Sequence, residues 1–172
     1  MAKHHTTPQV LSASQQAGLL GETFVAAWWK QQGWRIVSER WKCRWGELDV
    51  VVRSPPPAPP KRIHTLAFVE VKTRATRNWD QDGLLAITPQ KQTKLIRTAQ
   101  TFLSEFPAFA NDACRFDVAA IQCDRLTTAK PALPNPLELN QYSLKLSPDY
   151  PHTIHHHTLT LRHYIPNAFD LS

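Results

Sequence analysis

The sequence predicts an α/β protein in which a mixed central β-sheet is flanked by helices. Two stretches, 12–32 and 88–103, place apolar residues at helical spacing. Shorter runs have strand length and are rich in β-branched and aromatic residues; they are 34–37, 47–52, 66–72, 115–121 and 153–164. A chain of 172 residues is long enough for one domain with a real core and short for two. We therefore expect residues 1–172 to form a single domain.

The first helix is expected to begin after Ser12 or Ser14, both favourable N-caps, and to end at Gly33. Its buried stripe would consist of Leu20, Phe24, Ala27 and Trp28. Glu22 lies on the flank of that stripe, where the residue pattern alone favours an exposed position. Residues 1–11 show no periodicity and are expected to be a flexible N-terminal lead.

Basic and aromatic residues alternate over 40–45, between the first two predicted strands. This pattern suits a surface that contacts phosphates and exposed bases. Ordinary core or rim positions for Trp41 and Trp45 explain it equally well. The proline-rich stretch 54–60 cannot donate ladder hydrogen bonds and is stiff, so we expect the tip of an elongated hairpin there.

Two neighbouring apolar strands carry acids where a buried strand should have none. Side chains alternate across a strand, so Glu70 and Lys72 share one face, opposite Val69 and Val71; likewise, Glu47 and Asp49 should lie opposite Leu48 and Val50. Buried carboxylates need a cation, a proton or a partner. A divalent metal held by Asp49 and Glu70, beside Lys72, is one explanation; a salt bridge or a solvated face is the other.

The rest of the chain carries a second helix and two further strands. Residues 73–83 are polar and basic, as in a mobile loop, and Thr88-Pro89 then opens a helix with a basic stripe. Asp117 in the strand 115–121 is expected to form an ion pair with Arg115 or another nearby base. Residues 124–151 hold many prolines and little periodicity, so they are expected to be an irregular insertion before the last strand.

Composition narrows the class of protein. The net charge of +6 and the pI of about 9.5 favour a polyanionic partner, nucleic acid first. No apolar run approaches the ~20 residues that span a bilayer, and the N-terminus has no signal-peptide core. We therefore expect a cytoplasmic protein that does not enter a membrane. Three cysteines without a C-x-x-C pair indicate reduced thiols.

Several motifs together resemble the YraN-like family of small bacterial proteins. They are Gly21-Glu22, Gly33-Trp34, Cys43-Arg44-Trp45-Gly46-Glu47-Leu48-Asp49, Phe68-Val69-Glu70-Val71-Lys72-Thr73-Arg74, Lys91, Arg115-Phe116-Asp117-Val118 and Asn167-Ala168-Phe169. That family is similar to archaeal Holliday-junction resolvases and to the PD-(D/E)XK nuclease-like superfamily. The resemblance implies a restriction-endonuclease-like core. The proline-rich hairpin and the 124–151 insertion depart from the family pattern without touching the acids and the lysine.

The resemblance also implies a function. The family pattern makes Asp49 and Glu70 ligands of Mg²⁺ or Mn²⁺, Lys72 the motif lysine and Glu22 the helix acid, all four in a catalytic role. The expected activity is metal-dependent endonucleolytic hydrolysis of phosphodiester bonds, with DNA as the expected partner and branched DNA as the substrate by analogy. The expected phosphate-binding residues are Arg44, Arg74, Arg77 and Lys91. A homodimer is implied because resolvases act on two strands.

Two alternatives remain open at this point. A nucleic-acid-binding module could keep the fold without turnover, although the presence of Asp49, Glu70 and Lys72 speaks against a degenerate site. A protein-interaction factor could use the proline-rich hairpin to bind its partner.

Overall fold

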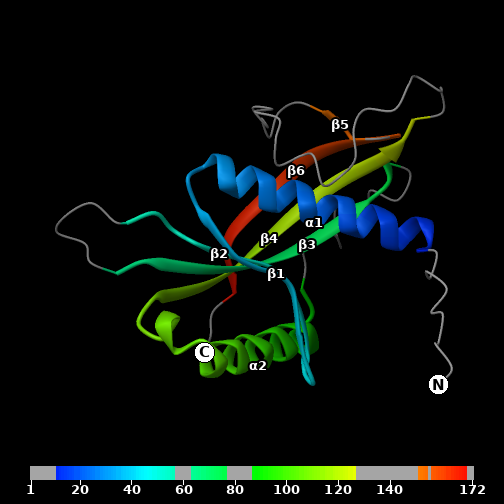
Figure 1. Cartoon of the computed structure of the whole chain (residues 1–172). Coiled ribbons are helices and arrows are strands. Elements are labelled where there is room, and N and C mark those ends of the chain that lie inside the picture. Colours follow the sequence, from blue (N-terminus) through cyan, green and yellow to red (C-terminus); the bar gives the residue numbers. More distant parts are fainter. Residues whose placement is uncertain (1–10, 57–62, 77–86, 127–150, 155, 170–172) are drawn as a thin grey trace, which may run out of the picture.

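The computed structural model describes residues 11–56, 63–76, 87–126, 151–154 and 156–169. Two α-helices pack against a six-stranded mixed sheet, with α1 on one face and α2 on the other (Figure 1). The predicted α/β class is confirmed, and the architecture is consistent with a restriction-endonuclease-like core. No helix in the described ranges is long and apolar enough to cross a membrane.

The sheet has the order β1-β2-β3-β4-β6-β5. Its strands are β1 (Arg35–Cys43), β2 (Gly46–Arg53), β3 (Thr65–Arg74), β4 (Ala113–Arg125), β5 (His152–Ile154) and β6 (His157–Phe169). Only β3 and β4 pair in parallel; every other neighbouring pair is antiparallel. A parallel neighbour needs a crossover connection, and α2 supplies it. The sheet is therefore mixed, as predicted.

Helix α1 (Ala13–Gln31) begins and ends where the sequence predicts. Ser12 caps it, accepting a hydrogen bond from the Gln15 amide, and Gly33 follows the helix with a φ of +79° that favours glycine. A Cβ atom at Gly21 would lie 2.1 Å from Thr73 Oγ1. Only glycine therefore permits this close crossing of α1 over β3, and the crossing brings the neighbouring Glu22 near the sheet.

Helix α2 (Pro89–Glu105) covers the opposite face and is followed by a 3₁₀ turn, Pro107–Phe109. Thr88 caps it and proline occupies the first turn, as predicted. Its buried side chains pack on aromatic and aliphatic residues of β2, β3 and β4; those of α2 are Leu95, Ala99 and Phe102, and those of the strands include Leu48, Phe68 and Phe116. The packing fixes the start of α2 beside the open end of the β2–β3 hairpin, where the pairing of the two strands ends.

Four predicted boundaries are wrong, each because strand pairing outweighs local composition. β1 continues through the basic–aromatic segment to Cys43, since Lys42 and Cys43 pair with β2. β3 extends to Arg74, and β4 extends to Arg125, because β3 and β4 run alongside each other and β6 covers the end of β4. The single strand predicted over 153–164 is two strands, the antiparallel pair β5 and β6.

Some predictions fall outside the described residues. These are the N-terminal lead over 1–10, the hairpin tip over 57–62, Arg77 in the stretch 77–86, and the inserted segment over 127–150. The hairpin itself exists: β2 and β3 pair in antiparallel fashion, and the Ser54 amide donates to the Thr65 carbonyl at 2.8 Å. The three cysteines are free, as predicted.

Candidate active site

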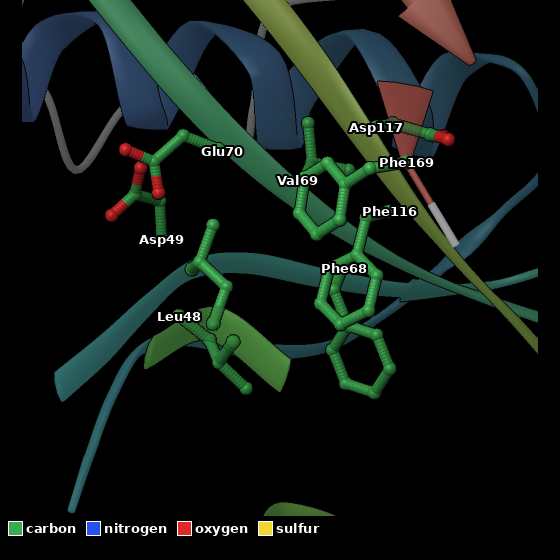
Figure 2. Close-up of a pocket in the computed structure, with 9 residues that line it drawn as sticks. Leu48, Asp49, Phe68, Val69, Glu70, Phe116, Asp117 and Phe169 are labelled. Atoms are coloured by element: carbon green, nitrogen blue, oxygen red, sulfur yellow. The ribbon is translucent and has the colours of Figure 1, made fainter. Parts of the chain in front are cut away.

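The two predicted acids of the strands meet where β2 and β3 part. The pairing between these strands runs from Arg53–Leu66 to Val50–Val69 and ends there. Asp49 and Glu70 are the next residues on the two strands, so they face each other just beyond the last pair. The Val71 amide, instead of pairing with a β2 carbonyl, donates to Asp49 Oδ2 at 2.8 Å. Figure 2 shows both carboxyl groups pointing to the same side of the sheet.

Glu70 is almost fully buried and binds two lysines through one oxygen. The residue is 6% exposed. Its Oε1 lies 2.9 Å from Lys72 Nζ and 3.1 Å from Lys91 Nζ. Its Oε2 is buried and has no hydrogen-bond partner among the described residues. A buried carboxylate oxygen that lacks a partner is costly, so this atom identifies a place where a further cation or donor would be accepted.

Asp49 carries the largest electrostatic perturbation of the cluster. Burial raises the pKa of Asp49 from 3.8 to about 7, with the negative charge of Glu70 adding to the effect and the Val71 amide opposing it. The charge of Glu22 raises this pKa further. Near neutral pH the Asp49 carboxyl is therefore balanced between its protonated and ionised forms. A bound cation would favour the ionised form.

The predicted assignment of side chains to the two faces of the sheet is right for β3 and wrong for β2. Val69 belongs to the core beneath α1, and Glu70 reaches Lys91 on α2, so neighbours on β3 alternate as predicted. On β2, Leu48 lies in the α2 core and Val50 in the α1 core, although two-residue spacing would place them together. The regular alternation fails at Asp49, where pairing with β3 ends. This irregularity lets Asp49 lie at the edge between both layers.

Glu22 is not the exposed helix residue that its position in α1 indicates. Its side chain is 18% exposed, and its Oε2 lies 3.4 Å from Arg40 Nε. The same guanidinium donates to Glu47 Oε1 at 3.0 Å, and Lys42 lies 3.4 Å from Glu47 Oε2. Burial raises the pKa of Glu22, and Arg40 opposes that shift. The helix acid therefore lies at the border of the Asp49 site, held by an arginine.

Arg40 is the residue that sequence reasoning missed. It lies on β1 between Glu39, which pairs with Val50, and Trp41, which pairs with Leu48, so it stands opposite Asp49. Its φ of +52° is unusual for a non-glycine residue. No local pattern reveals such a conformation, and the only signal in the sequence is its place in the basic–aromatic stretch.

The expected phosphate-binding residues that the structure describes lie at different places relative to Asp49 and Glu70. Lys91 contacts Glu70 directly. Arg44 is exposed at the β1–β2 turn and lies over the Trp45 ring. Arg74 is exposed at the end of β3 and donates to the Thr73 carbonyl. Lys91 is thus in contact with the carboxylate pair, whereas Arg44 precedes Asp49 in the β1–β2 turn and Arg74 follows Glu70 along β3.

Asp117 lies apart from this cluster and is satisfied by other residues. Arg115 contacts its Oδ2 at 3.0–3.1 Å, and the Asn167 amide donates to its Oδ1 at 2.8 Å. The Tyr164 hydroxyl also donates to Oδ2. In Figure 2 its carboxyl group points away from Asp49 and Glu70. The predicted pairing with Arg115 is confirmed.

The donor set fits a hard divalent cation. Carboxylate oxygens are the ligands that Mg²⁺ and Mn²⁺ prefer, and no described residue hydrogen-bonds the buried Oε2 of Glu70. Within the described ranges, no three His, Cys, Asp or Glu side chains come together as a complete ligand set. Magnesium in phosphoryl-transfer sites usually needs only one or two carboxylates, because water and phosphate complete its shell. Asp49 and Glu70 meet that requirement.

Comparison with known proteins gives the family. The model of the uncharacterised protein family UPF0102 matches residues 21–121, which include all four predicted catalytic positions. A UPF0102 protein of Acaryochloris marina is 44% identical over 165 residues, 95% of each chain. One of Trichodesmium erythraeum is 41% identical over 165 residues, 92% of this chain and 91% of that relative. One of a Synechococcus species is 50% identical over 108 residues, 63% and 76% of the two chains. The chain therefore belongs to the UPF0102 family, the YraN-like family.

Proposed function

We propose that this protein is a metal-dependent nuclease that hydrolyses phosphodiester bonds in DNA. One observation carries the proposal: Asp49 and Glu70, on adjacent strands, converge where the pairing of these strands ends. One oxygen of Glu70 is buried and has no partner among the described residues, and two lysines lie within 3.1 Å of its other oxygen. A structural ion pair would leave neither an unpartnered oxygen nor a second acid beside it. The likeness to a restriction-endonuclease-like core supports the same function.

Asp49 and Glu70 would hold Mg²⁺ or Mn²⁺. When bound, the metal polarises the scissile phosphate and lowers the pKa of a coordinated water. The Val71 amide donates a hydrogen bond to Asp49 Oδ2 and so orients this carboxyl group. Glu70 is almost fully buried and Asp49 is half-buried, and the lower local dielectric strengthens the interaction of the pair with a cation.

Lys72 and Lys91 provide the positive charge of the site. Both ammonium groups lie on Glu70 Oε1, at 2.9 Å and 3.1 Å. Lys72 would orient the attacking water or donate to a phosphate oxygen as negative charge develops in the transition state. Lys91, more exposed and based on α2, would contact the phosphate backbone, a contact that carries no sequence information.

Glu22 and Arg40 would act from the border of the site. Arg40 holds Glu22 in a half-buried position beside Asp49. Glu22 in its charged form would help to orient a hydrated metal ion. Arg40 limits the repulsion among Glu22, Glu47 and Asp49, since it lies on or near all three.

A cleavage assay tests this function. Purified protein is incubated with labelled linear duplex, single-stranded and four-way-junction DNA in Mg²⁺, Mn²⁺ or EDTA. Cutting that requires metal and is lost in Asp49→Asn, Glu70→Gln and Lys72→Ala supports the proposal. Asp112→Asn is the matched control, because its side chain is as buried as that of Glu70, at 6%, and pairs with Arg53 at the opposite end of β3.

The opposite result has a definite meaning. DNA binding without cutting under any metal would replace the nuclease by a non-catalytic binding module of the same fold. Equal cutting by the wild type and the three site variants would indicate a contaminating nuclease and overturn the assignment of the site.

A further inference from the structure

The β1–β2 turn presents an exposed tryptophan. Cys43 pairs with Gly46, so Arg44 and Trp45 alone form the loop of the hairpin. The Trp45 amide is 3.4 Å from Cys43 Sγ, a contact that supports the turn. Trp45 is 37% exposed, whereas Trp41, the other tryptophan of the basic–aromatic stretch, packs edge-on against the buried Phe102. Trp41 is therefore a core or rim residue, as one of the two alternatives from the sequence has it, whereas Trp45 stays exposed.

Two arginines gather at the Trp45 ring. The Arg44 guanidinium carbon lies 4.7 Å from the ring centroid, and that of Arg97 on α2 lies 5.1 Å from it. Both arginines are exposed, as is Lys94 one turn before Arg97. Among the described residues, these three cations take part in none of the ion pairs with carboxylates. Their charge is therefore available to an anionic ligand.

This cluster is continuous with the candidate active site. Lys91, Lys94 and Arg97 recur every three residues along one side of α2. The first and last are about 9 Å apart along the helix axis, at 1.5 Å per residue. Along β2, Trp45 and Asp49 are separated by about 13 Å, at 3.3 Å per residue. A cationic stripe thus leads from Glu70, where Lys91 lies, to the exposed ring.

We propose that Trp45 stacks on an unpaired base of the substrate while Arg44 and Arg97 hold the flanking phosphates. Indole faces stack on any base, and guanidinium groups beside them bind phosphate, so the combination is suited to single-stranded nucleic acid. This inference rests on the proposed nuclease function and adds a substrate class: DNA with a single-stranded or unstacked segment a few nucleotides from the cleaved bond.

A purely structural role explains the turn less well. A ring that only covered α2 would pack against apolar side chains, as the half-buried Trp41 does against Phe102. Trp45 instead keeps 37% of its surface exposed, with two guanidinium groups over its ring. Among the described residues, neither arginine forms an ion pair with an acid. An acidic protein partner would satisfy the charges but would have no use for an exposed indole face. An oligonucleotide satisfies both.

Binding measured without metal tests the inference separately from cleavage. Fluorescence anisotropy in EDTA compares a labelled single-stranded oligonucleotide with the matching duplex. Trp45→Leu should weaken single-strand binding about 5- to 150-fold, the range for one stacked base, and duplex binding much less. Arg97→Ala should weaken both and lower the salt slope for the single strand by about 0.7.

Matched variants control for surface charge and for an exposed ring. Arg35→Ala removes an exposed arginine that lies 5.6 Å from the Phe109 ring, near the opposite end of β1. Phe106→Leu removes an exposed aromatic ring at the end of α2. Both should bind single-stranded DNA like the wild type. Circular dichroism confirms that every variant is folded.

The outcomes separate the inference from the proposed function. Unchanged single-strand binding in folded Trp45→Leu, or equal losses for single strand and duplex, overturns the stacking site even if the wild type cuts DNA. Selective loss of single-strand binding in a protein that never cuts keeps the stacking site and rejects the nuclease. Losses in Arg35→Ala as large as in Arg97→Ala would show that net charge alone is responsible, and this too overturns the inference.

Discussion

Asp117 and the Asp49–Glu70 pair are acids in the interior of one sheet, and the fold supplies their carboxyl groups with very different sets of partners. Asp117 is fully buried and receives an arginine, a tyrosine hydroxyl and a backbone amide. Asp49 receives one backbone amide, and Glu70 concentrates its two lysines on a single oxygen. In the part of the chain that the structure describes, the second oxygen of Glu70 has no partner.

The difference separates a structural acid from a candidate catalytic one. Every interaction that Asp117 needs is supplied by the fold, so its charge stabilises the native state. The Asp49–Glu70 pair keeps its charges close together and incompletely compensated, which costs stability unless a cation or proton arrives. The predictions below test this contrast from the largest expected effect to the smallest.

The largest effect is expected on catalysis. Asp49→Asn and Glu70→Gln should each lower the rate of metal-dependent DNA cleavage by about 10²–10⁴-fold, since each removes a charged group that acts on the transition state. Single-turnover cleavage at saturating protein measures the loss. A decrease below about threefold in both variants would remove these acids from the active site.

The second effect is on stability and involves the structural acid. Asp117→Ala should lower the free energy of unfolding by about 3–5 kcal/mol, because it removes the fully buried partner of the half-buried Arg115, the Tyr164 hydroxyl and the Asn167 amide. Urea denaturation followed by circular dichroism measures the change. A loss below about 1 kcal/mol would show that the Asp117 network contributes no more than a surface pair.

The third effect is a gain in stability, opposite in sign to the loss expected for Asp117→Ala. Burial, with the Glu70 charge, raises the pKa of Asp49 from 3.8 to about 7. In the window between these values the unfolded chain releases a proton that the folded chain keeps, so the Asp49 contribution to stability falls as pH rises. Asp49→Asn should therefore stabilise the metal-free protein by about 2 kcal/mol at pH 8, less than the whole window would give because Asp49 is still partly open to water.

The pH dependence identifies the cause of that gain. In EDTA, the difference in unfolding free energy between Asp49→Asn and the wild type should be near zero at pH 4, grow until about pH 7 and then remain constant. A gain that is the same at pH 4 and pH 8 would mean that the substitution acts through packing and not through charge.

The smallest effect tests a single hydrogen bond of the structural acid. Tyr164→Phe should lower the free energy of unfolding by about 1.5 kcal/mol, the size of a hydrogen bond to a charged group. Arg115 and the Asn167 amide still compensate Asp117 in this variant. A loss as large as that of Asp117→Ala would show that the network fails as a unit.

Local patterns were sufficient for the fold class, for the faces of β3 and for the helix ends. The alternation of β3 correctly separated Glu70 and Lys72 from Val69 and Val71, because both faces of that strand are covered and its register is fixed. Ser12, Gly33 and Thr88-Pro89 marked helix ends through capping chemistry that needs no distant partner.

What the sequence missed depends on contacts between distant segments. The break in alternation at Asp49 arises because pairing with β3 stops there, and nothing near Asp49 in the sequence encodes that event. The half-buried position of Glu22 depends on the close crossing of α1 over β3 and on Arg40, whose backbone has an unusual φ. Pairing with β2 and β4 also extended strands through segments that appeared irregular.

Direct measurement of Mn²⁺ binding tests most simply whether the Asp49–Glu70 pair is a cation site. Titration at pH 8 by isothermal calorimetry should give one site in the wild type and in the Asp112→Asn control, weakened at least about tenfold in Asp49→Asn and Glu70→Gln. Affinity should fall toward pH 6, because protons compete at Asp49, whose pKa burial raises to about 7. Equal Mn²⁺ affinity in all four proteins would contradict the account.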